Sequence, residues 1–159
     1  MDSFSHLDEQ GQPSMVDISE KKITQRTAKA RSIVFLPDEI LNAFAEGDIR
    51  SKKGSVFQTA IIAGIMAAKK TGDLIPLCHP LGLDNCQISI SLNESKELQI
   101  DCTASITQKT GVEMEALVGA SIAALTVYDM CKALSHDIVI KETKLMEKTG
   151  GKRDFKREQ

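Results

Sequence analysis

The sequence pattern that decides the fold is Cys86-Gln87-Ile88-Ser89-Ile90-Ser91-Leu92, in which apolar and polar residues alternate. The polar segment Asn93-Glu94-Ser95-Lys96 follows it, and the alternation resumes over residues 98–106. A period of two residues places one set of side chains on one face of a strand. Two such runs joined by a short polar segment are typical of a hairpin, so the pattern predicts two antiparallel strands with one buried face.

Apolar segments on either side of this hairpin predict two helices. The first runs through residues 56–68, after Gly54-Ser55 and before Lys69-Lys70; it is apolar on nearly every side, which indicates deep burial. The second is expected from about Glu113 to Leu134. It carries small residues that allow another element to approach closely, namely Gly119, Ala120, Ser121, Ala123 and Ala124.

Outer strands complete the pattern. Residues 31–36 predict a strand, and Pro37 with two acidic residues after it predicts a helix that ends at Gly47. A last strand is expected at residues 138–140, continuing toward Leu145-Met146. The order strand, helices, strand, strand, helix, strand matches the split βαβ arrangement of ferredoxin-like folds. We therefore expect an α+β sandwich of the ferredoxin-like βαββαβ type, with an antiparallel sheet.

The 159 residues suit one domain with its own core. Residues 1–14 are polar and aperiodic, and we interpret them as a flexible N-terminal tail. Residues 15–159 form the single expected catalytic domain, with a flexible, charged C-terminal flap over about residues 148–159.

The balance of 20 Lys and Arg against 22 Asp and Glu gives a net charge of -2, so no global positive field favours nucleic acid. No Trp and one Tyr disfavour base-stacking modules. We expect neither a segment long enough to span a bilayer nor a signal core. The four cysteines lie at no disulfide-rich spacing, which fits reduced thiols in the cytoplasm.

Asp129 and Lys132 are the first candidate pair, because residues three apart on a helix can touch. A solvated ion pair is the alternative, but apolar neighbours favour burial of the pair and hence a function. Glu115 lies 14 residues before Asp129, about 21 Å away on a helix. One compact site could hardly use both ends, so we expect sites shared between subunits of an oligomer.

His79 lies between Pro76 and Pro80, which fix the direction of its side chain. It is either a hydrogen-bonded structural histidine or a proton carrier, and the two readings stay equally open. Zinc bound by Cys78, His79 and Cys86 lacks the usual ligand spacing, so we predict no metal site.

Two basic turns could bind phosphate. Lys53 with Lys52 precedes a helix N-terminus, where an anion would offset both charges; a solvated loop is the default alternative. Lys152 follows Gly150-Gly151 in the C-terminal flap. The turn Lys109-Thr110-Gly111 is basic as well, but the phosphate-loop and dinucleotide fingerprints are missing.

Three motifs together resemble the cyclic pyranopterin monophosphate synthase family of molybdenum cofactor biosynthesis. They are residues 73–80 (DLIPLCHP), 109–117 (KTGVEMEAL) and 128–133 (YDMCKA), and the similarity runs from about Met15 to Phe155. The chain departs from the family in the flap, where Lys152-Arg153 runs into Asp154-Phe155 without a further glycine.

The resemblance implies a hexamer, a trimer of dimers, that converts 3′,8-cyclo-7,8-dihydro-GTP to cyclic pyranopterin monophosphate and diphosphate. Such an enzyme is a phosphorus-oxygen lyase, and it would receive its substrate from an upstream radical enzyme. The resemblance places Asp129 and Lys132 at the chemical centre. It implies a larger set of substrate-binding residues, to which we add Arg26 as a possible phosphate-neutralising cation: Arg26, Lys53, Leu77, Cys78, His79, Glu113, Met114, Glu115 and Lys152.

We hypothesise that Asp129 and Lys132 exchange protons with the substrate, the lysine having a pKa lowered by burial. Lys53, Lys152 and Arg26 would neutralise the triphosphate. No cofactor is required by the sequence, although magnesium could accompany the triphosphate. Two alternatives are a non-catalytic nucleotide-sensing module, for which the Asp129 carboxylate would be of little use, and a zinc-dependent hydrolase.

Overall fold

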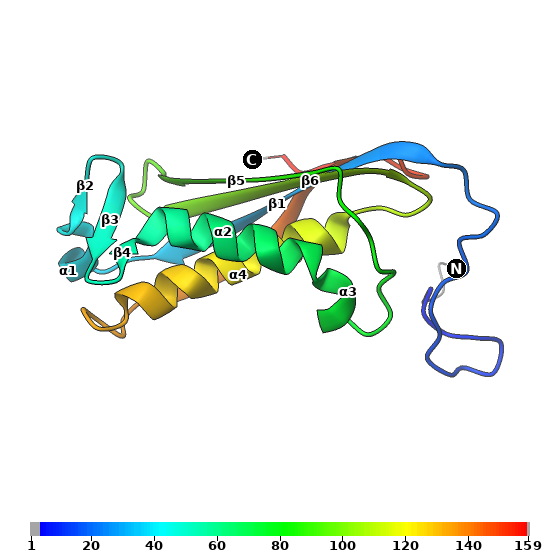
Figure 1. The fold of residues 1–159 in the computed structure, drawn as a ribbon, viewed down its shortest axis with the longest axis horizontal. Coiled ribbons are helices and arrows are strands. Elements are labelled where there is room, and N and C mark those ends of the chain that lie inside the picture. The colour runs from blue at the N-terminus through cyan, green and yellow to red at the C-terminus, as the bar shows by residue number, and fades with distance from the viewer. Residues whose placement is uncertain (1–3, 159) are drawn as a thin grey trace.

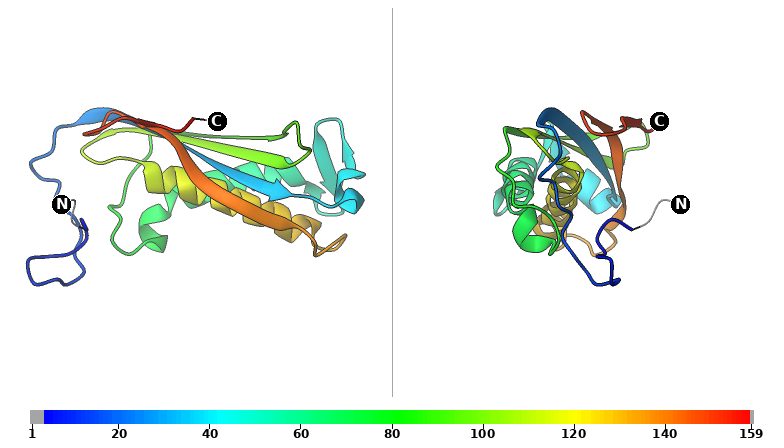
Figure 2. Two further views of the ribbon diagram at one scale, coloured as in Figure 1. Left: turned by 180° about the vertical axis from the view of Figure 1, so that it is seen from behind. Right: turned by 90° about the vertical axis from the view of Figure 1, so that its right-hand side faces the viewer.

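The computed structural model describes residues 4–158 and has an α+β architecture, as expected. A five-stranded antiparallel sheet has the strand order β5-β6-β1-β7-β8. Figure 1 and Figure 2 show the two long helices on the same side of this sheet. The strands are β1 (Thr24–Phe35), β5 (Asn85–Leu92), β6 (Leu98–Gln108), β7 (Val139–Thr149) and β8 (Phe155–Lys156), and the long helices are α2 (Val56–Lys69) and α4 (Glu113–Cys131).

Smaller elements close one end of the molecule. A three-stranded sheet with the order β2-β3-β4 precedes α2 (Figure 1). It comprises β2 (Phe44–Ala45), β3 (Asp48–Ser51) and β4 (Gly54–Ser55). The short helix α1 (Asp38–Leu41) lies at the same end, whereas α3 (Thr71–Leu74) lies at the opposite end of the molecule (Figure 1).

The predicted hairpin is confirmed. Strand β5 pairs with β6 in the register Ile88↔Cys102 and Leu92↔Leu98. Alternate residues of β6 are buried: Leu98, Ile100, Cys102, Ala104 and Ile106. The hairpin therefore supplies the buried face that its alternation predicts.

Strand β1 is longer than predicted and lies in the centre of the sheet, paired with both β6 and β7. The first half of β1 was not predicted because its buried side chains, Ala28 and Ala30, are small. They give little hydrophobic contrast with the polar residues between them. The helix predicted after Pro37 is confirmed at its start, but its predicted extent to Gly47 is wrong. Helix α1 ends at Leu41, and Glu46 and Gly47, both with positive φ, turn the chain from β2 into β3.

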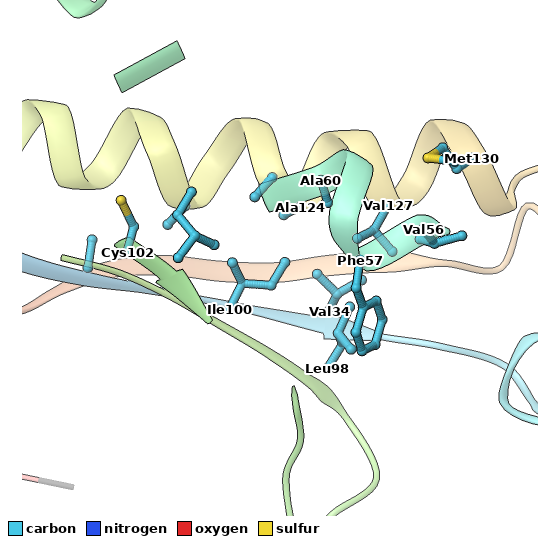
Figure 3. Close-up of a cluster of buried hydrophobic side chains, with 14 of the residues drawn as sticks. Val34, Val56, Phe57, Ala60, Leu98, Ile100, Cys102, Ala124, Val127 and Met130 are labelled. Atoms are coloured by element: carbon cyan, nitrogen blue, oxygen red, sulfur yellow. The ribbon is translucent and has the colours of Figure 1, made fainter. Parts of the chain in front are cut away.

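The two long helices approach each other closely at paired glycines. A Cβ at Gly64 would lie 2.7 Å from the Gly119 carbonyl oxygen and 2.3 Å from Ile88 Cδ1. In Figure 3, Val34, Leu98 and Ile100 of the sheet lie opposite Ala124 and Val127 of α4. The predicted role of small residues on α4 is confirmed, since they let α2 and the sheet pack against it.

Helix α4 is long and apolar enough to cross a membrane, with a mean hydropathy of 1.3 over its most apolar stretch. The expectation that no segment has this length is therefore wrong. Half of that stretch is buried inside the fold, and packing against α2 and β1 accounts for its apolar character.

The chain ends have defined structure over the described residues. Leu7 and Pro13 form an isolated bridge within the N-terminal segment, and β8 pairs with β7 in the C-terminal flap. The flexibility expected for both segments stays a prediction.

Candidate functional site

A cavity of about 800 Å³ opens at the N-terminal end of α4. Its walls come from the N-terminal segment, the loop after α3, the first turn of α4, the start of β1 and the flap after β7. Eight of the nine predicted substrate-binding residues line it, and only Lys53 does not: Arg26, Leu77, Cys78, His79, Glu113, Met114, Glu115 and Lys152. The structure thus brings together residues from four separate chain segments.

Two carboxylates, Glu113 and Glu115, line the cavity. Glu115 is 4% exposed, and burial raises its pKa, with the nearby Glu113 charge acting in the same direction. Glu113 forms an ion pair with Lys148, 3.0 Å between Oε1 and Nζ. Burial and the Glu115 charge likewise raise the pKa of Cys78, which keeps that thiol neutral. At Glu115 and Cys78, the surroundings therefore favour the protonated form over the charged one.

His79 joins the cavity to the N-terminal segment. Its Nε2 lies 2.8 Å from the Val16 carbonyl oxygen; since a carbonyl can only accept, Nε2 carries the proton. This contact is the hydrogen bond of a structural histidine, while Nδ1 stays available for a ligand. Arg26 is held in a similar way, because its Nε donates to the Gln108 carbonyl oxygen at 3.1 Å.

The flap depends on Gly150. This residue has φ +87, and a Cβ would lie 1.9 Å from the Gln25 carbonyl oxygen, so no other residue fits there without moving backbone. Thr24 Oγ1 donates to the Gly150 carbonyl oxygen at 2.7 Å, and Gly150 N donates to Asp154 Oδ1 at 3.1 Å. These contacts hold Lys152 at the wall of the cavity.

A second charged cluster lies at the C-terminal end of α4. Asp129 contacts Lys132 at 2.9 Å and Lys53 at 3.9 Å. The three side chains are 56%, 51% and 67% exposed. The hydrogen bond from Lys132 lowers the pKa of Asp129, and the same bond raises the pKa of Lys132. The expected burial of the pair and the expected lowering of the Lys132 pKa are both wrong for the isolated chain.

Asp48 fixes the turn that carries Lys53. Its Oδ1 accepts from Ile49 N at 2.6 Å and from Phe57 N at 2.9 Å, and its Oδ2 accepts from the Ser55 hydroxyl. Ser55 in turn caps α2 by accepting from Gln58 N at 3.1 Å. Because Lys53 lies in the short β3–β4 connection between these contacts, it is presented toward Asp129.

Within one chain, the residues of the cavity lie far from the Lys53–Asp129–Lys132 cluster. Glu115 and Asp129 are 14 residues apart on the same helix, which is about 21 Å. Neither Asp129, Lys132 nor Lys53 lines the cavity. The separation predicted from the sequence is thus present in the folded chain.

Sequence reasoning missed several residues of the cavity. Lys21, Lys22 and Lys148 add positive charge, and Ser5 and His6 of the N-terminal segment form part of its wall. The two lysines stand only four and five residues before Arg26, a density of charge that could have indicated them. Nothing in the sequence connects His6 to residues so far along the chain.

The cysteines do not converge on His79. Cys86 Sγ lies 3.8 Å from Cys102 Sγ, which packs against α4 at Gly119, whereas Cys78 lines the cavity. Within residues 4–158, no group of three His, Cys, Asp or Glu side chains is arranged to hold a metal ion.

Comparison with known proteins gives a consistent result. Residues 15–151 match the MoaC family. The chain is 53% identical to cyclic pyranopterin monophosphate synthase of Xanthomonas campestris pv. campestris (strain 8004), covering 96% of this chain and 92% of the relative. It is 54% identical to the protein of the same name from Lysinibacillus sphaericus (strain C3-41), covering 96% of each.

Some relatives are longer. The molybdenum cofactor biosynthesis bifunctional protein of Synechocystis sp. is 54% identical over 95% of this chain, which covers 45% of that protein. The resemblance drawn from the three motifs is therefore confirmed, and the chain belongs to the MoaC family.

Proposed function

We propose that the protein is a cyclic pyranopterin monophosphate synthase acting in molybdenum cofactor biosynthesis. It would convert cyclised dihydro-GTP to cyclic pyranopterin monophosphate and diphosphate, as a phosphorus-oxygen lyase. The observation that carries the proposal is the composition of the cavity. Five cationic residues, which would suit a polyanionic substrate, line the cavity together with a buried carboxyl group: Lys21, Lys22, Arg26, Lys148, Lys152 and Glu115.

We further propose a ferredoxin-like subunit that assembles as a trimer of dimers. The strand order and the positions of α2 and α4 support the first point. The separation of the two clusters supports the second, because a site that used both would need the cavity of one subunit and the Lys53–Asp129–Lys132 cluster of a neighbour.

In such a shared site, Lys132 would act as general acid and Asp129 as general base. The ion pair favours the protonated lysine and the ionised carboxylate, which are the forms these roles require at the start of the reaction. A substrate hydroxyl would attack the α-phosphorus, and diphosphate would leave. Lys53, Lys152 and Arg26 would stabilise the charge on the leaving diphosphate.

The chemistry of the proposed reaction indicates which cofactors and partners the protein would need. The protein itself would need no cofactor, and magnesium would enter only with the triphosphate. Its substrate would come directly from an upstream radical enzyme. Four free cysteines fit a reducing cytoplasm.

Mass spectrometry of the products tests the proposal. The full-length protein, its Lys132→Ala variant and a Lys144→Ala control are each mixed with enzymatically prepared cyclised dihydro-GTP. Lys144 forms an ion pair of the same 2.9 Å length with Glu142, outside both clusters. We expect cyclic pyranopterin monophosphate and diphosphate from the parent and the control only. Binding of the nucleotide without any product from the parent would instead favour the nucleotide-sensing module.

A further inference from the structure

We propose that residues 4–14 form one wall of the substrate site, and that His6 on this segment contacts the bound substrate. The inference rests on the proposed function, since the ligand is the substrate named above. These residues precede the part of the chain that matches the family. Their role follows from the geometry of this chain alone.

The segment folds into a turn that hydrogen bonds hold in place. Asp8 Oδ1 accepts from Gln10 N at 2.9 Å and from Gln12 N at 2.8 Å. Backbone bonds close it further, Asp8 N to the Gln12 carbonyl at 2.9 Å and Ser14 N to the His6 carbonyl at 2.9 Å. Such bonds from one Asp side chain to following N–H groups hold a turn in one conformation, so His6 has a defined position on it.

Two contacts attach the adjoining stretch to the site. His79 Nε2 donates to the Val16 carbonyl oxygen at 2.8 Å, and Lys109 Nζ donates to the Ser19 carbonyl oxygen at 2.9 Å. Both donors belong to the motifs that surround the cavity. In Figure 1 and Figure 2 the N-terminal segment lies at the end of the molecule that carries α3 and the start of α4. These donors therefore hold residues 16–19, which follow directly on the segment, beside the cavity.

Ser5 and His6 complete the wall on this side. Within residues 4–158, the His6 ring has no hydrogen-bond partner, whereas the His79 ring uses one nitrogen to hold the segment. An imidazole can donate or accept a hydrogen bond, and His6 lines the same cavity as Lys21, Lys22 and Lys152. His6 is thus placed to bind the same polyanionic ligand as these lysines.

Steady-state kinetics of the full-length protein with cyclised dihydro-GTP test the inference. His6→Ala should raise KM about tenfold and leave kcat within about twofold, because it removes one hydrogen bond to a charged ligand. Asp8→Ala should raise KM similarly by releasing the turn. Asp8→Asn keeps the accepting Oδ1 and should restore the parent KM. Gln10→Ala, whose side chain faces solvent outside the cavity, is the matched control and should change neither constant.

The outcomes separate this inference from the proposed function. Absence of product from the parent protein would refute the proposed function itself. Normal turnover by the parent with an unchanged KM for His6→Ala would refute only the proposal that residues 4–14 form a wall of the substrate site. A lower thermal unfolding midpoint for His6→Ala with an unchanged KM would give the segment a role in folding alone, and would overturn the inference as well.

Discussion

Two inactive variants should restore activity when their chains are mixed in one assembly. Glu115→Ala removes a group at the cavity, and Lys132→Ala removes one at the far end of α4, 17 residues further on, or about 26 Å along the helix. If each site takes its cavity from one copy and its Asp129 cluster from another, a mixed assembly contains sites with neither defect.

The expected magnitude follows from counting. In a random one-to-one mixture, half the cavities and half the clusters are intact, so about a quarter of the sites combine two intact ends. Co-expression of differently tagged chains, followed by tandem purification and native mass spectrometry, provides assemblies of known composition. Product formation per chain should then approach a quarter of the parent rate, while each variant alone is inactive.

A matched control uses two defects at the same end. Mixing Asp129→Ala with Lys132→Ala leaves one altered cluster in every site, so no activity should return. The reasoning is refuted if assemblies with verified mixed composition remain inactive for the Glu115 and Lys132 pair, since both ends would then have to come from one chain.

Three further predictions concern single residues. Glu115→Gln should raise stability at neutral pH, because burial raises the folded-state pKa of Glu115 and the wild type loses stability as pH rises through the range between its unfolded and folded values. Thermal unfolding should show this difference at pH 7 and its disappearance below the ordinary glutamate pKa. Gly64→Ala should destabilise the fold by about 1–2 kcal/mol, since overpacking against Ile88 and the Gly119 carbonyl outweighs the gain in helix propensity; urea unfolding measures it, and an unchanged midpoint would contradict the close approach. Asp48→Ala should cost about 1–3 kcal/mol by leaving three donors without an acceptor. It should also raise the KM of the substrate through displacement of Lys53, an effect that Asp48→Asn should largely reverse.

The sequence was most informative where one pattern extended over many residues. The β5–β6 hairpin follows from a period of two residues, and helix α2 follows from a long apolar run between Gly54-Ser55 and Lys69-Lys70. It was least informative where the buried residues are small. Ala28 and Ala30 are buried in the central strand, yet a run such as Thr27-Ala28-Lys29-Ala30 carries little hydrophobic contrast, so half of β1 was missed.

The candidate site, too, was predicted only in part. The family resemblance assigned His79 and Glu115 to one site, and both line the cavity. The burial expected for Asp129 was wrong because apolar neighbours on a helix face the core, while Asp129 itself faces outward at the helix end. Apolar neighbours in the sequence indicate that some face of a helix is buried. Which residues of that helix face solvent depends on where α2 and the sheet pack against it.

Helix α4 explains why the two charged ends are so far apart and yet fixed relative to each other. Its middle packs closely, through Gly119, against Gly64 and Cys102. Because Glu115 and Asp129 lie on this one continuous helix, their separation is fixed by its rise. If the proposed shared site forms, a ligand that uses both ends would lie where the α4 helices of two copies bring opposite ends together. On that proposal, Asp129 and Lys132 are exposed in the single chain because the cavity of another copy would cover them.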